Sequence, residues 1–380
     1  MTGSKKEKRF MKHHDHKRII ISGGGTGGHI FPAISIANAL RRTDPETEIL
    51  FVGAEGRMEM EKVPAAGYRI IGLPVAGFIR SLTPKNLVVV YKLAASILKA
   101  RKIIKEFNPD VVVGVGGYAS GPVLRVAGNM GIPTIIQEQN SYAGVTNKLL
   151  AKKASVICVA YDGMEKYFPA EKIIKTGNPV RQNFDNLANL KDEALTYFKL
   201  KSEQPVILIL GGSLGAGTIN NSIAANIQKA GSSGCQWLWQ TGVNYFDEMN
   251  ELAANASYGN ISVHNFINRM DLAYAAADII ISRAGAGTIS ELCLVGKPVI
   301  LVPSPNVAED HQTRNAMALT GRHAALMIRD SDAFTTMVDE AIKLISSREE
   351  KASLSANIRL MADRDADMRI ANEVLKLASG

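Results

Sequence analysis

The amino-acid sequence predicts an α/β protein made of two parallel-sheet domains, and three observations carry that prediction. Short runs of aliphatic and β-branched residues alternate along the chain with longer segments of helical periodicity, which is typical of α/β folds. Most of the short runs are continuously apolar, as strands are when helices cover both faces of a parallel sheet. A length of 380 residues is also enough for about two domains of roughly 150 residues each.

A strand is expected wherever such an apolar run lies between turn-forming residues. In the first half of the chain these runs are Arg18–Ser22, Glu48–Val52, Arg69–Gly72, Asp110–Val115, Thr134–Gln137, Ser155–Val159 and Ile173–Thr176. In the second half they are Pro205–Leu210, Gln236–Trp239, Ile261–Val263, Asp278–Ser282 and Pro298–Val302. Helical periodicity predicts helices over Lys85–Lys105, Asp310–Thr320, Asp332–Ser346, Glu349–Met361 and Ala366–Leu377.

Two strand–turn–helix units of similar sequence open the two halves of the chain. Ile19–Ala37 and Val206–Ala224 share an isoleucine in the strand, glycines in the turn and a Ser-Ile-Ala run in the helix. Their placement predicts two Rossmann-like domains in tandem, 18–177 and 178–362, which meet at the turn-forming segment Gly177-Asn178-Pro179. Because ligands of such domains bind at the carboxyl ends of the strands, we expect the site in the cleft between the domains.

The positive charge is concentrated at the start of the chain. The formal net charge is +8, from 44 Lys and Arg against 36 Asp and Glu, and the first 18 positions hold seven of the basic and two of the acidic residues. The rest of the chain is therefore nearly balanced. We expect residues 1–17 to form a basic, disordered leader, and we expect no nucleic-acid partner.

Targeting and cysteine patterns predict a cytoplasmic protein. No secretory apolar core follows the basic leader, and no stretch of 18 apolar residues is present to span a membrane. The cysteines, Cys158, Cys235 and Cys293, form no CxxC pair. We expect free buried thiols in a reducing compartment and no zinc site.

Four glycine-rich loops follow predicted strands, two in each half. They are Gly23–His29, Gly114–Pro122, Gly211–Gly217 and Ser282–Thr288. Glycines let the backbone approach a phosphate closely, and the helix that follows each loop offers N–H donors and a positive dipole end. One such loop is usually only a tight turn, whereas four at strand ends predict anionic ligands on both walls of the cleft. We infer a donor with a diphosphate and an acceptor that also carries phosphate.

Several polar residues near these loops have a structural and a functional interpretation. His29 either makes a local hydrogen bond at a helix start or serves as a general base beside a phosphate. Thr288 and Glu291 match a capping box, with Thr288 at the N-cap and Glu291 at N3, but the same carboxylate could hold ribose hydroxyls. Arg181 suits phosphate oxygens or a surface salt bridge, and the polar segment 138–140 is either a loop or part of the site rim.

The predicted helix Lys85–Lys105 carries more apolar surface than one core-facing side requires. Lys85, Lys92 and Lys99 recur every seven residues, and Lys102 follows three residues later, so these lysines share one stripe. Such a stripe is usually a solvated face. The alternative is an apolar patch with lysines around it that lies on an anionic membrane.

Together the motifs resemble the MurG family of bacterial glycosyltransferases, which add N-acetylglucosamine (GlcNAc) to lipid I in peptidoglycan synthesis. The resemblance runs from about Lys17 to the end of the chain, through GGGTGGHIFPAISIANAL, GVGGYASGPVL, QEQNSYAGVTNKLLAK, TGNPVR, ILGGSLGA, NFINRMDLAYAAADIIISRAGAGTISEL and EDHQTRNA. It implies a GT-B fold, with residues 363–380 returning as a helix to the first domain. It also implies a metal-independent, inverting transfer from UDP-GlcNAc to the 4-hydroxyl of the N-acetylmuramic acid of lipid I, which gives lipid II.

The resemblance assigns site residues position by position, with the donor mainly on the second domain and lipid I on the first. Donor positions are Thr26, Gly27, Gly28, Asn140, Arg181, Ser213, Ile267, Ala286, Gly287, Thr288, Ile289, Ser290, Glu291 and Gln312. Acceptor-diphosphate positions are Gly24, Gly25, Gly116, Gly117, Tyr118, Ser120 and Gly121. It implies that Ser213 contacts the donor diphosphate, Ile267 the uracil through its backbone, and Glu291 the ribose. His29 is the candidate base.

The same resemblance implies a peripheral enzyme on the cytoplasmic side of the bacterial inner membrane. Its expected partners are UDP-GlcNAc, lipid I, the anionic membrane surface, and proteins of cell-wall synthesis or division, with a role in cell shape and the cell cycle. Two positions depart from the family pattern: Leu214 stands where glutamine is common, and Gly287 where a larger residue is usual. Neither needs a side chain for a backbone contact to phosphate, so we expect modest effects.

Three other functions are compatible with a two-domain α/β fold. A UDP-sugar 2-epimerase would act on a soluble nucleotide and needs no membrane patch, which disfavours it. A dinucleotide oxidoreductase requires an acid at the end of the second strand, and Glu55 comes late for that role. The third alternative is a noncatalytic nucleotide-sugar sensor.

Overall fold

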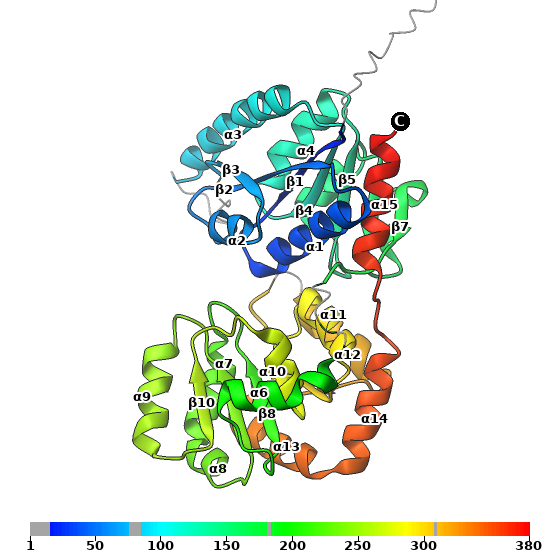
Figure 1. Cartoon of the computed structure of the whole chain (residues 1–380). Coiled ribbons are helices and arrows are strands. Elements are labelled where there is room, and N and C mark those ends of the chain that lie inside the picture. Colours follow the sequence, from blue (N-terminus) through cyan, green and yellow to red (C-terminus); the bar gives the residue numbers. More distant parts are fainter. Residues whose placement is uncertain (1–15, 76–84, 181–183, 185, 308–309) are drawn as a thin grey trace, which may run out of the picture.

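The structure, a computed structural model, consists of two α/β domains (Figure 1) and describes residues 16–75, 85–180, 184, 186–307 and 310–380. Each domain contains one sheet whose neighbouring strands are all parallel. The predicted fold class is therefore confirmed, and every predicted strand is present to within two residues at each end. Of the predicted leader, residues 1–15 lie outside the described part of the chain.

The sheet of the first domain has seven strands in the order β3-β2-β1-β4-β5-β6-β7. Their bounds are β1 Arg18–Gly23, β2 Glu48–Ala54, β3 Arg69–Leu73, β4 Val111–Gly116, β5 Thr134–Glu138, β6 Val156–Val159 and β7 Ile173–Lys175. In the central strand β1, Ile19 and Ile21 pack into the core on one face, whereas Ile20 packs into the core on the other. Helices on both faces thus explain why the strand is continuously apolar.

The sheet of the second domain has six strands in the order β10-β9-β8-β11-β12-β13. Their bounds are β8 Val206–Leu210, β9 Gln236–Gln240, β10 Ile261–His264, β11 Ile279–Ser282, β12 Val299–Leu301 and β13 Leu326–Met327. Ile207 and Ile209 of β8 face one core and Leu208 faces the other. Strand β13 escaped prediction because two residues are too few to show a hydrophobic period.

The helices connect these strands in chain order. In the first domain they are α1 Gly27–Thr43, α2 Glu59–Ala65, α3 Lys85–Phe107, α4 Ser120–Asn129 and α5 Val145–Leu150. In the second they are α6 Lys191–Phe198, α7 Gly217–Ala225, α8 Ile227–Gly231, α9 Phe246–Ala256, α10 Met270–Ala276, α11 Ala286–Val295, α12 His311–Thr320, α13 Ala333–Ser346 and α14 Arg348–Arg359. The last helix is α15 Ala366–Ala378, and short 3-10 helices span Met164–Lys166, Ala170–Lys172 and Leu187–Leu190.

The similar sequence units occupy equivalent places in the two sheets. Strands β1 and β8 each occupy the third place in their sheets, and β4 and β11 pair with them directly. The glycine loops that follow these four strands therefore lie side by side in pairs at the carboxyl edges of their sheets. Each loop leads into a helix, α1 and α4 in the first domain and α7 and α11 in the second.

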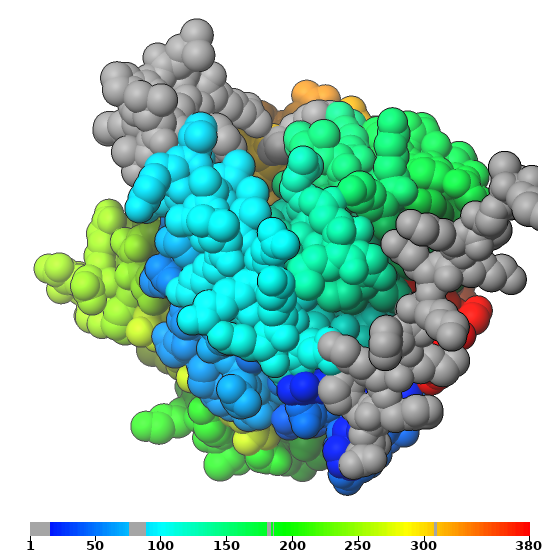
Figure 2. Space-filling view, turned by 90° about the horizontal axis from the view of Figure 1, so that it is seen from above, coloured from blue at the N-terminus to red at the C-terminus, as the bar shows by residue number. Residues whose placement is uncertain are grey.

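The C-terminal helix α15 packs on the first domain, although α14 before it belongs to the second (Figure 1). Ile370, Ala371 and Val374 join the same core cluster as residues of β1 and α1, and the guanidinium of Arg42 lies 2.6 Å from the carboxylate of Asp367. The chain consequently crosses between the domains twice. Seen from above, α3 and α4 cover the end of the first domain that lies away from the second (Figure 2).

Candidate functional site

A pocket of about 260 Å³ lies between the two domains and is lined from both sides. The first domain contributes Gly27, Gly28, Phe31 and Pro32 of α1. The linker and the second domain contribute Pro179, Val180, Leu210, Gly211, Gly212, Ser213, Gln240, Phe266, Ile267, Met270, Tyr274, Ser282, Arg283, Gly287, Thr288 and Glu291. These residues come mostly from the carboxyl ends of the strands and the helix starts that follow, which is where a doubly wound fold binds its ligand.

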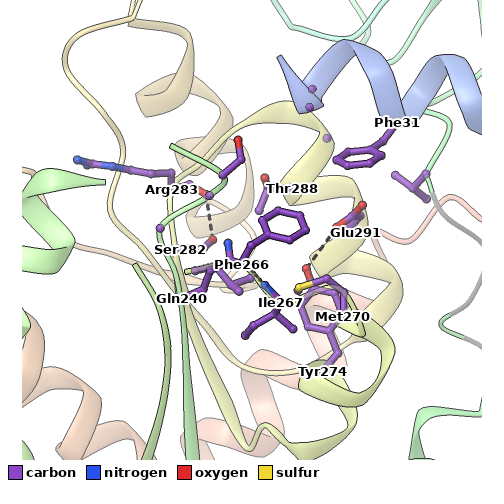
Figure 3. A pocket seen from close by; sticks show the side chains of 18 of the residues that line it. Phe31, Gln240, Phe266, Ile267, Met270, Tyr274, Ser282, Arg283, Thr288 and Glu291 are labelled. Carbon is purple, nitrogen blue, oxygen red and sulfur yellow. Dashed lines mark hydrogen bonds between the residues drawn. The ribbon is translucent and has the colours of Figure 1, made fainter. Parts of the chain in front are cut away.

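One side of the pocket is apolar, and a carboxylate lies beside it (Figure 3). Phe266, Ile267 and Met270 form the apolar side, and Phe31 extends toward it from α1. The hydroxyl of Tyr274 lies 3.3 Å from a carboxylate oxygen of Glu291. An apolar wall can hold a planar ring and a carboxylate can accept hydrogen bonds from vicinal hydroxyls, so the lining suits a nucleoside.

The backbone of Ile267 is already engaged on its donor side. Its N–H donates to the side-chain oxygen of Gln240 over 2.9 Å. Any backbone contact from Ile267 to a nucleobase would therefore use its carbonyl. Gln240 is 4% exposed at the end of β9, and it fixes this segment beneath the pocket.

The predicted capping box at Thr288 and Glu291 is wrong. Helix α11 begins at Ala286, and its N-cap is Gly285 in an extended conformation (φ −66°, ψ 144°). Gly285 accepts the first helical hydrogen bond from the N–H of Ile289, at 2.9 Å. Because the helix starts earlier than predicted, Thr288 lies in its first turn and Glu291 lies one turn later. The carboxylate of Glu291 therefore lines the pocket and does not cap the helix.

The first turn of α11 presents its N–H groups toward the cleft. Gly287 and Thr288 line the pocket together with the loop residues Gly212 and Ser213 after β8. A helix start of this kind, beside a glycine loop, is a site for phosphate. Gly287, which departs from the family pattern, has no heavy atom within 4 Å of where a Cβ would stand, so this departure leaves open space.

The other donor positions among the described residues do not line this pocket. Ile289 packs in the core, and Ala286 is also buried. Ser290 donates to the carbonyl of Ala286 over 3.0 Å. Thr26 and Asn140 also lie outside the lining, and the amide nitrogens of Asn140 face the carboxylate of Glu138. Arg181 lies outside the described residues.

Gln312 lies in a second, polar pocket of about 390 Å³ that shares Arg283 with the first. Its side-chain oxygen accepts the N–H of Ser304 over 2.9 Å and that of Ala284 over 3.3 Å. Arg283 donates to the carbonyls of Val302 and Pro303. These bonds hold the two pockets in a fixed relation at the end of β11 and β12.

The two glycine loops of the first domain touch each other. Gly24, Gly25, Gly116 and Gly117 all have positive φ angles, and a Cβ on Gly117 would come within 2.3 Å of the carbonyl oxygen of Gly24. Only glycine permits this approach. The predicted acceptor residues of both loops therefore form one continuous backbone surface, and such a surface can cradle an anion.

The other predicted acceptor positions flank this backbone surface. Ser120 is buried, and its hydroxyl donates to the carbonyl of Gly117 over 2.9 Å. A Cβ on Gly121 would lie 3.2 Å from the methyl of Thr146. Tyr118 is 61% exposed, so it is accessible to a ligand that approaches from solvent.

The imidazole of His29 lies against the meeting point of the two loops. Its Nδ1 is 3.3 Å from the hydroxyl of Thr26, and a Cβ on Gly116 would stand 2.4 Å from the ring. Burial lowers the pKa of His29, and the negative charge of Glu59 partly opposes this effect. The ring is therefore neutral at pH 7 and able to accept a proton.

Sequence reasoning missed several residues of the site. Glu59 is 1% exposed and hydrogen-bonds the first glycine loop. Phe31, Phe266 and Arg283 line the main pocket, and the ammonium of Lys62 lies 5.4 Å from the ring centroid of Phe266 across the cleft. Phe266 is next to the predicted donor residue Ile267, and Arg283 lies within the predicted glycine loop Ser282–Thr288. Nothing in the local pattern marked Glu59, which follows a polar turn.

Fold and site together define a two-domain protein of the GT-B fold class with its candidate ligand site between the domains. Profiles of the Glycosyltransferase family 28 N-terminal and C-terminal domains match residues 19–159 and 206–370. The chain belongs to glycosyltransferase family 28.

Close relatives carry one shared description. A Phocaeicola vulgatus protein is 60% identical over 365 residues, covering 96% of this chain and 97% of the relative. A Parabacteroides distasonis protein is 58% identical over 360 residues, covering 95% and 98%. Both are named UDP-N-acetylglucosamine–N-acetylmuramyl-(pentapeptide) pyrophosphoryl-undecaprenol N-acetylglucosamine transferase.

Solved structures share the fold over nearly the whole chain. MurG of Acinetobacter baumannii matches with a TM-score of 0.72 at 28% identity, covering 95% of this chain and 99% of that one. The UDP-GlcNAc 2-epimerase of Neisseria meningitidis matches with a TM-score of 0.67 at 16% identity, covering 95% and 100%. The second match shows that transferases and epimerases use this fold alike, so the fold alone does not separate the two activities.

Proposed function

We propose that this protein transfers GlcNAc from UDP-GlcNAc to the 4-hydroxyl of the N-acetylmuramic acid of lipid I and so forms lipid II. The observation that carries the proposal is the cleft itself. The pocket between the domains combines an apolar wall and a carboxylate of the second domain with Gly27 and Gly28 of the first, and these two glycines directly follow the loop that Gly117 contacts. Relatives at 58–60% identity over nearly the full length, named for this transfer, support the same substrates.

The donor lies on the second domain in this proposal. The uracil occupies the apolar side at Phe266 and Ile267, the carboxylate of Glu291 accepts from the ribose hydroxyls, and the diphosphate meets the N–H groups of Gly212 and Ser213 and the start of α11. Helix and loop donors of this kind stabilise negative charge without a metal ion. We therefore expect transfer to proceed without added divalent cation.

The acceptor lies on the first domain, with the diphosphate of lipid I on the loops that contain Gly24 and Gly117. The 4-hydroxyl attacks the anomeric carbon of GlcNAc as the bond from that carbon to the UDP oxygen breaks, so the configuration inverts. UDP leaves with the bond electrons. His29, which is neutral at pH 7, takes the proton of the attacking hydroxyl.

A transfer assay tests the function directly. Purified protein is mixed with labelled UDP-GlcNAc and a lipid I analogue, with chelator present, and the label is followed into the lipid product. We expect transfer with chelator and no conversion of UDP-GlcNAc when acceptor is absent. Conversion of the donor to UDP-N-acetylmannosamine without acceptor would instead establish the epimerase, and donor binding with neither reaction would establish the sensor.

Glu291 is expected to contribute to donor affinity. Its carboxylate lines the pocket one turn into α11, and a hydrogen bond to a charged group is worth about 1.5–3 kcal/mol. Glu291→Gln should therefore weaken UDP-GlcNAc binding about tenfold or more, as measured by calorimetric titration. Glu349→Gln, on the surface of α14, is the control. Unchanged affinity with a lower melting temperature would leave Glu291 a structural role alone.

The outer surface of the first domain carries an apolar stripe on α3, formed by exposed side chains that include Tyr91 and Leu98. No helix among the described residues is long and apolar enough to span a bilayer. On α3, Tyr91 is 75% and Leu98 70% exposed, and α3 covers this end of the domain (Figure 2). We propose that this stripe, with the lysines beside it, lies on the anionic cytoplasmic face of the bacterial membrane, where lipid I and proteins of cell-wall synthesis would meet the enzyme.

The four predicted patch lysines differ in their surroundings. Lys99 pairs with Glu55 over 2.7 Å, and Lys102 approaches Glu106 at 3.8 Å. The side chain of Lys85 lies outside the described part. Lys92 is half-buried beside the apolar stripe. Lys99 is therefore already paired with an acid of its own domain. Reversing its charge would place two carboxylates side by side, the new one and that of Glu55.

Membrane binding is best tested with Leu98→Ser combined with Lys92→Glu. Removing one exposed apolar side chain and reversing one charge should weaken binding to anionic vesicles by about tenfold, since a juxtamembrane lysine alone is worth about 1 kcal/mol. Sedimentation with phosphatidylglycerol vesicles measures the effect. Lys343→Glu, on α13 of the second domain, is the matched control. Equal sedimentation of all three proteins would remove the stripe from the proposal.

A further inference from the structure

We infer that Glu59 is a positioning residue of the acceptor site, whose buried carboxylate fixes the first glycine loop and, through that loop, the place of Thr26 beside the imidazole of His29. The inference deepens the proposed function, since it rests on His29 acting as the base of that transfer. Glu59 is the first residue of α2 and does not line the main pocket. It acts through its neighbours and touches no substrate.

The carboxylate of Glu59 joins the ends of two adjacent strands. One oxygen accepts the N–H of Gly25 in the loop after β1, at 2.9 Å, and the other accepts the N–H of Ala54 at the end of β2, also at 2.9 Å. The side chain is 1% exposed. A buried carboxylate is costly unless hydrogen bonds compensate it, and these two charge-assisted bonds do so.

Two glycines make room for this carboxylate. A Cβ on Gly24 would stand 2.1 Å from one carboxylate oxygen, and a Cβ on Gly53 would stand 2.6 Å from the Cγ of Glu59. Part of the glycine pattern in the first loop is therefore explained by the space that Glu59 occupies, in addition to access for a phosphate. The first glycine loop and the carboxylate of Glu59 therefore pack against each other as one rigid substructure.

The charge of Glu59 is unexpected beneath a loop that binds an anion, because it would repel a diphosphate. Its field instead favours the protonated form of His29 and opposes the effect of burial on the pKa of that residue. The groups that contact the imidazole are the hydroxyl of Thr26 and the backbone of Gly116, with the exposed phenol of Tyr118 as the titratable side chain of that loop. Glu59 acts on the imidazole through its charge and through the loop that it holds. When His29 takes a proton during transfer, Glu59 is placed to stabilise the resulting imidazolium.

Glu59→Gln tests this role by removing the charge at nearly constant shape. We expect the pKa of His29, followed by NMR of the imidazole carbons, to fall by about 0.5 or more, and the acidic limb of kcat to move to lower pH with it. We also expect a KM for the lipid I analogue about tenfold higher, because an amide cannot accept from both N–H groups, and an unchanged KM for UDP-GlcNAc. Glu61→Gln, in the same helix with an exposed carboxylate, is the matched control.

The NMR measurement of the pKa of His29 tests this inference separately from the proposed function. If wild-type protein fails to transfer GlcNAc while the pKa of His29 still falls in Glu59→Gln, the function is wrong and the coupling stands. If transfer occurs and the pKa of His29 is the same in wild type and variant, the inference is overturned. Glu59→Asp keeps the charge but cannot span both N–H groups, so a wild-type KM for the acceptor in that variant would also overturn it.

Discussion

Replacing His29 with asparagine should lower kcat for GlcNAc transfer by about 10²–10⁴-fold, the usual contribution of a positioned general base. The affinity for UDP-GlcNAc should stay within about twofold, because His29 does not line the donor pocket although Gly27 and Gly28 do. Asparagine retains a polar group beside Thr26 and fits the space against Gly116. Initial rates with the lipid I analogue, together with calorimetric donor titration, measure both quantities.

The pH dependence gives His29 a second signature. Burial lowers the pKa of His29 in the folded protein, and a base works only when deprotonated. Activity should therefore be full at neutral pH and fall as the pH drops through that lowered pKa, below the ordinary value of about 6.5. His323→Asn, at an exposed position with a left-handed φ of 49° that asparagine tolerates, is the control. A wild-type kcat in His29→Asn would assign the proton to another group.

Gly117→Ala should be the most damaging single change in the acceptor loops. The φ of Gly117 is 85°, and its new methyl would stand 2.3 Å from the carbonyl oxygen of Gly24. One loop must move, which separates the backbone surface assigned to the diphosphate. We expect a loss of unfolding free energy of about 1–3 kcal/mol and a KM for the lipid I analogue at least tenfold higher, from chemical denaturation and initial rates.

Gly131→Ala separates the effect of backbone strain from the effect of the collision between the two glycine loops. Gly131 has a similar φ of 75°, but no heavy atom lies within 4 Å of its missing Cβ. This variant carries the backbone strain without the collision, so it should lose stability and keep the acceptor KM. If Gly117→Ala raised the acceptor KM no more than Gly131→Ala does, the contact between the two glycine loops would have no part in binding.

The architecture was predictable because burial on both faces of a sheet leaves a one-dimensional signature. Ile19, Ile20 and Ile21 are fully buried in cores on opposite faces of the sheet, and their unbroken apolar run indicates this directly. The short strand Leu326–Met327 carries no such signature, since two residues define no period. The start of α11 was misplaced because the capping-box pattern is local, whereas Gly285 already provides the extended cap.

The site was predictable where it coincides with strand ends. The loops after β1, β4, β8 and β11 follow from topology, because parallel strands bring their carboxyl ends to one edge. Glu59 was not predictable, since its two bonds join separate strand ends. Asn140 shows the opposite difficulty: its amide suits a ligand in sequence, but a nearby carboxylate binds it in the structure.

The two crossings between the domains are fastened to each other. Arg369, in α15, donates to the carbonyl of Thr176 over 2.7 Å and also pairs with Asp363 just before that helix. Gly177 lacks a side chain where the carboxylate of Asp363 approaches. Both connections between the two domains are therefore joined to each other at one place. A rotation of one domain relative to the other would therefore have to turn the backbone at that place, far from the outer rim of the cleft.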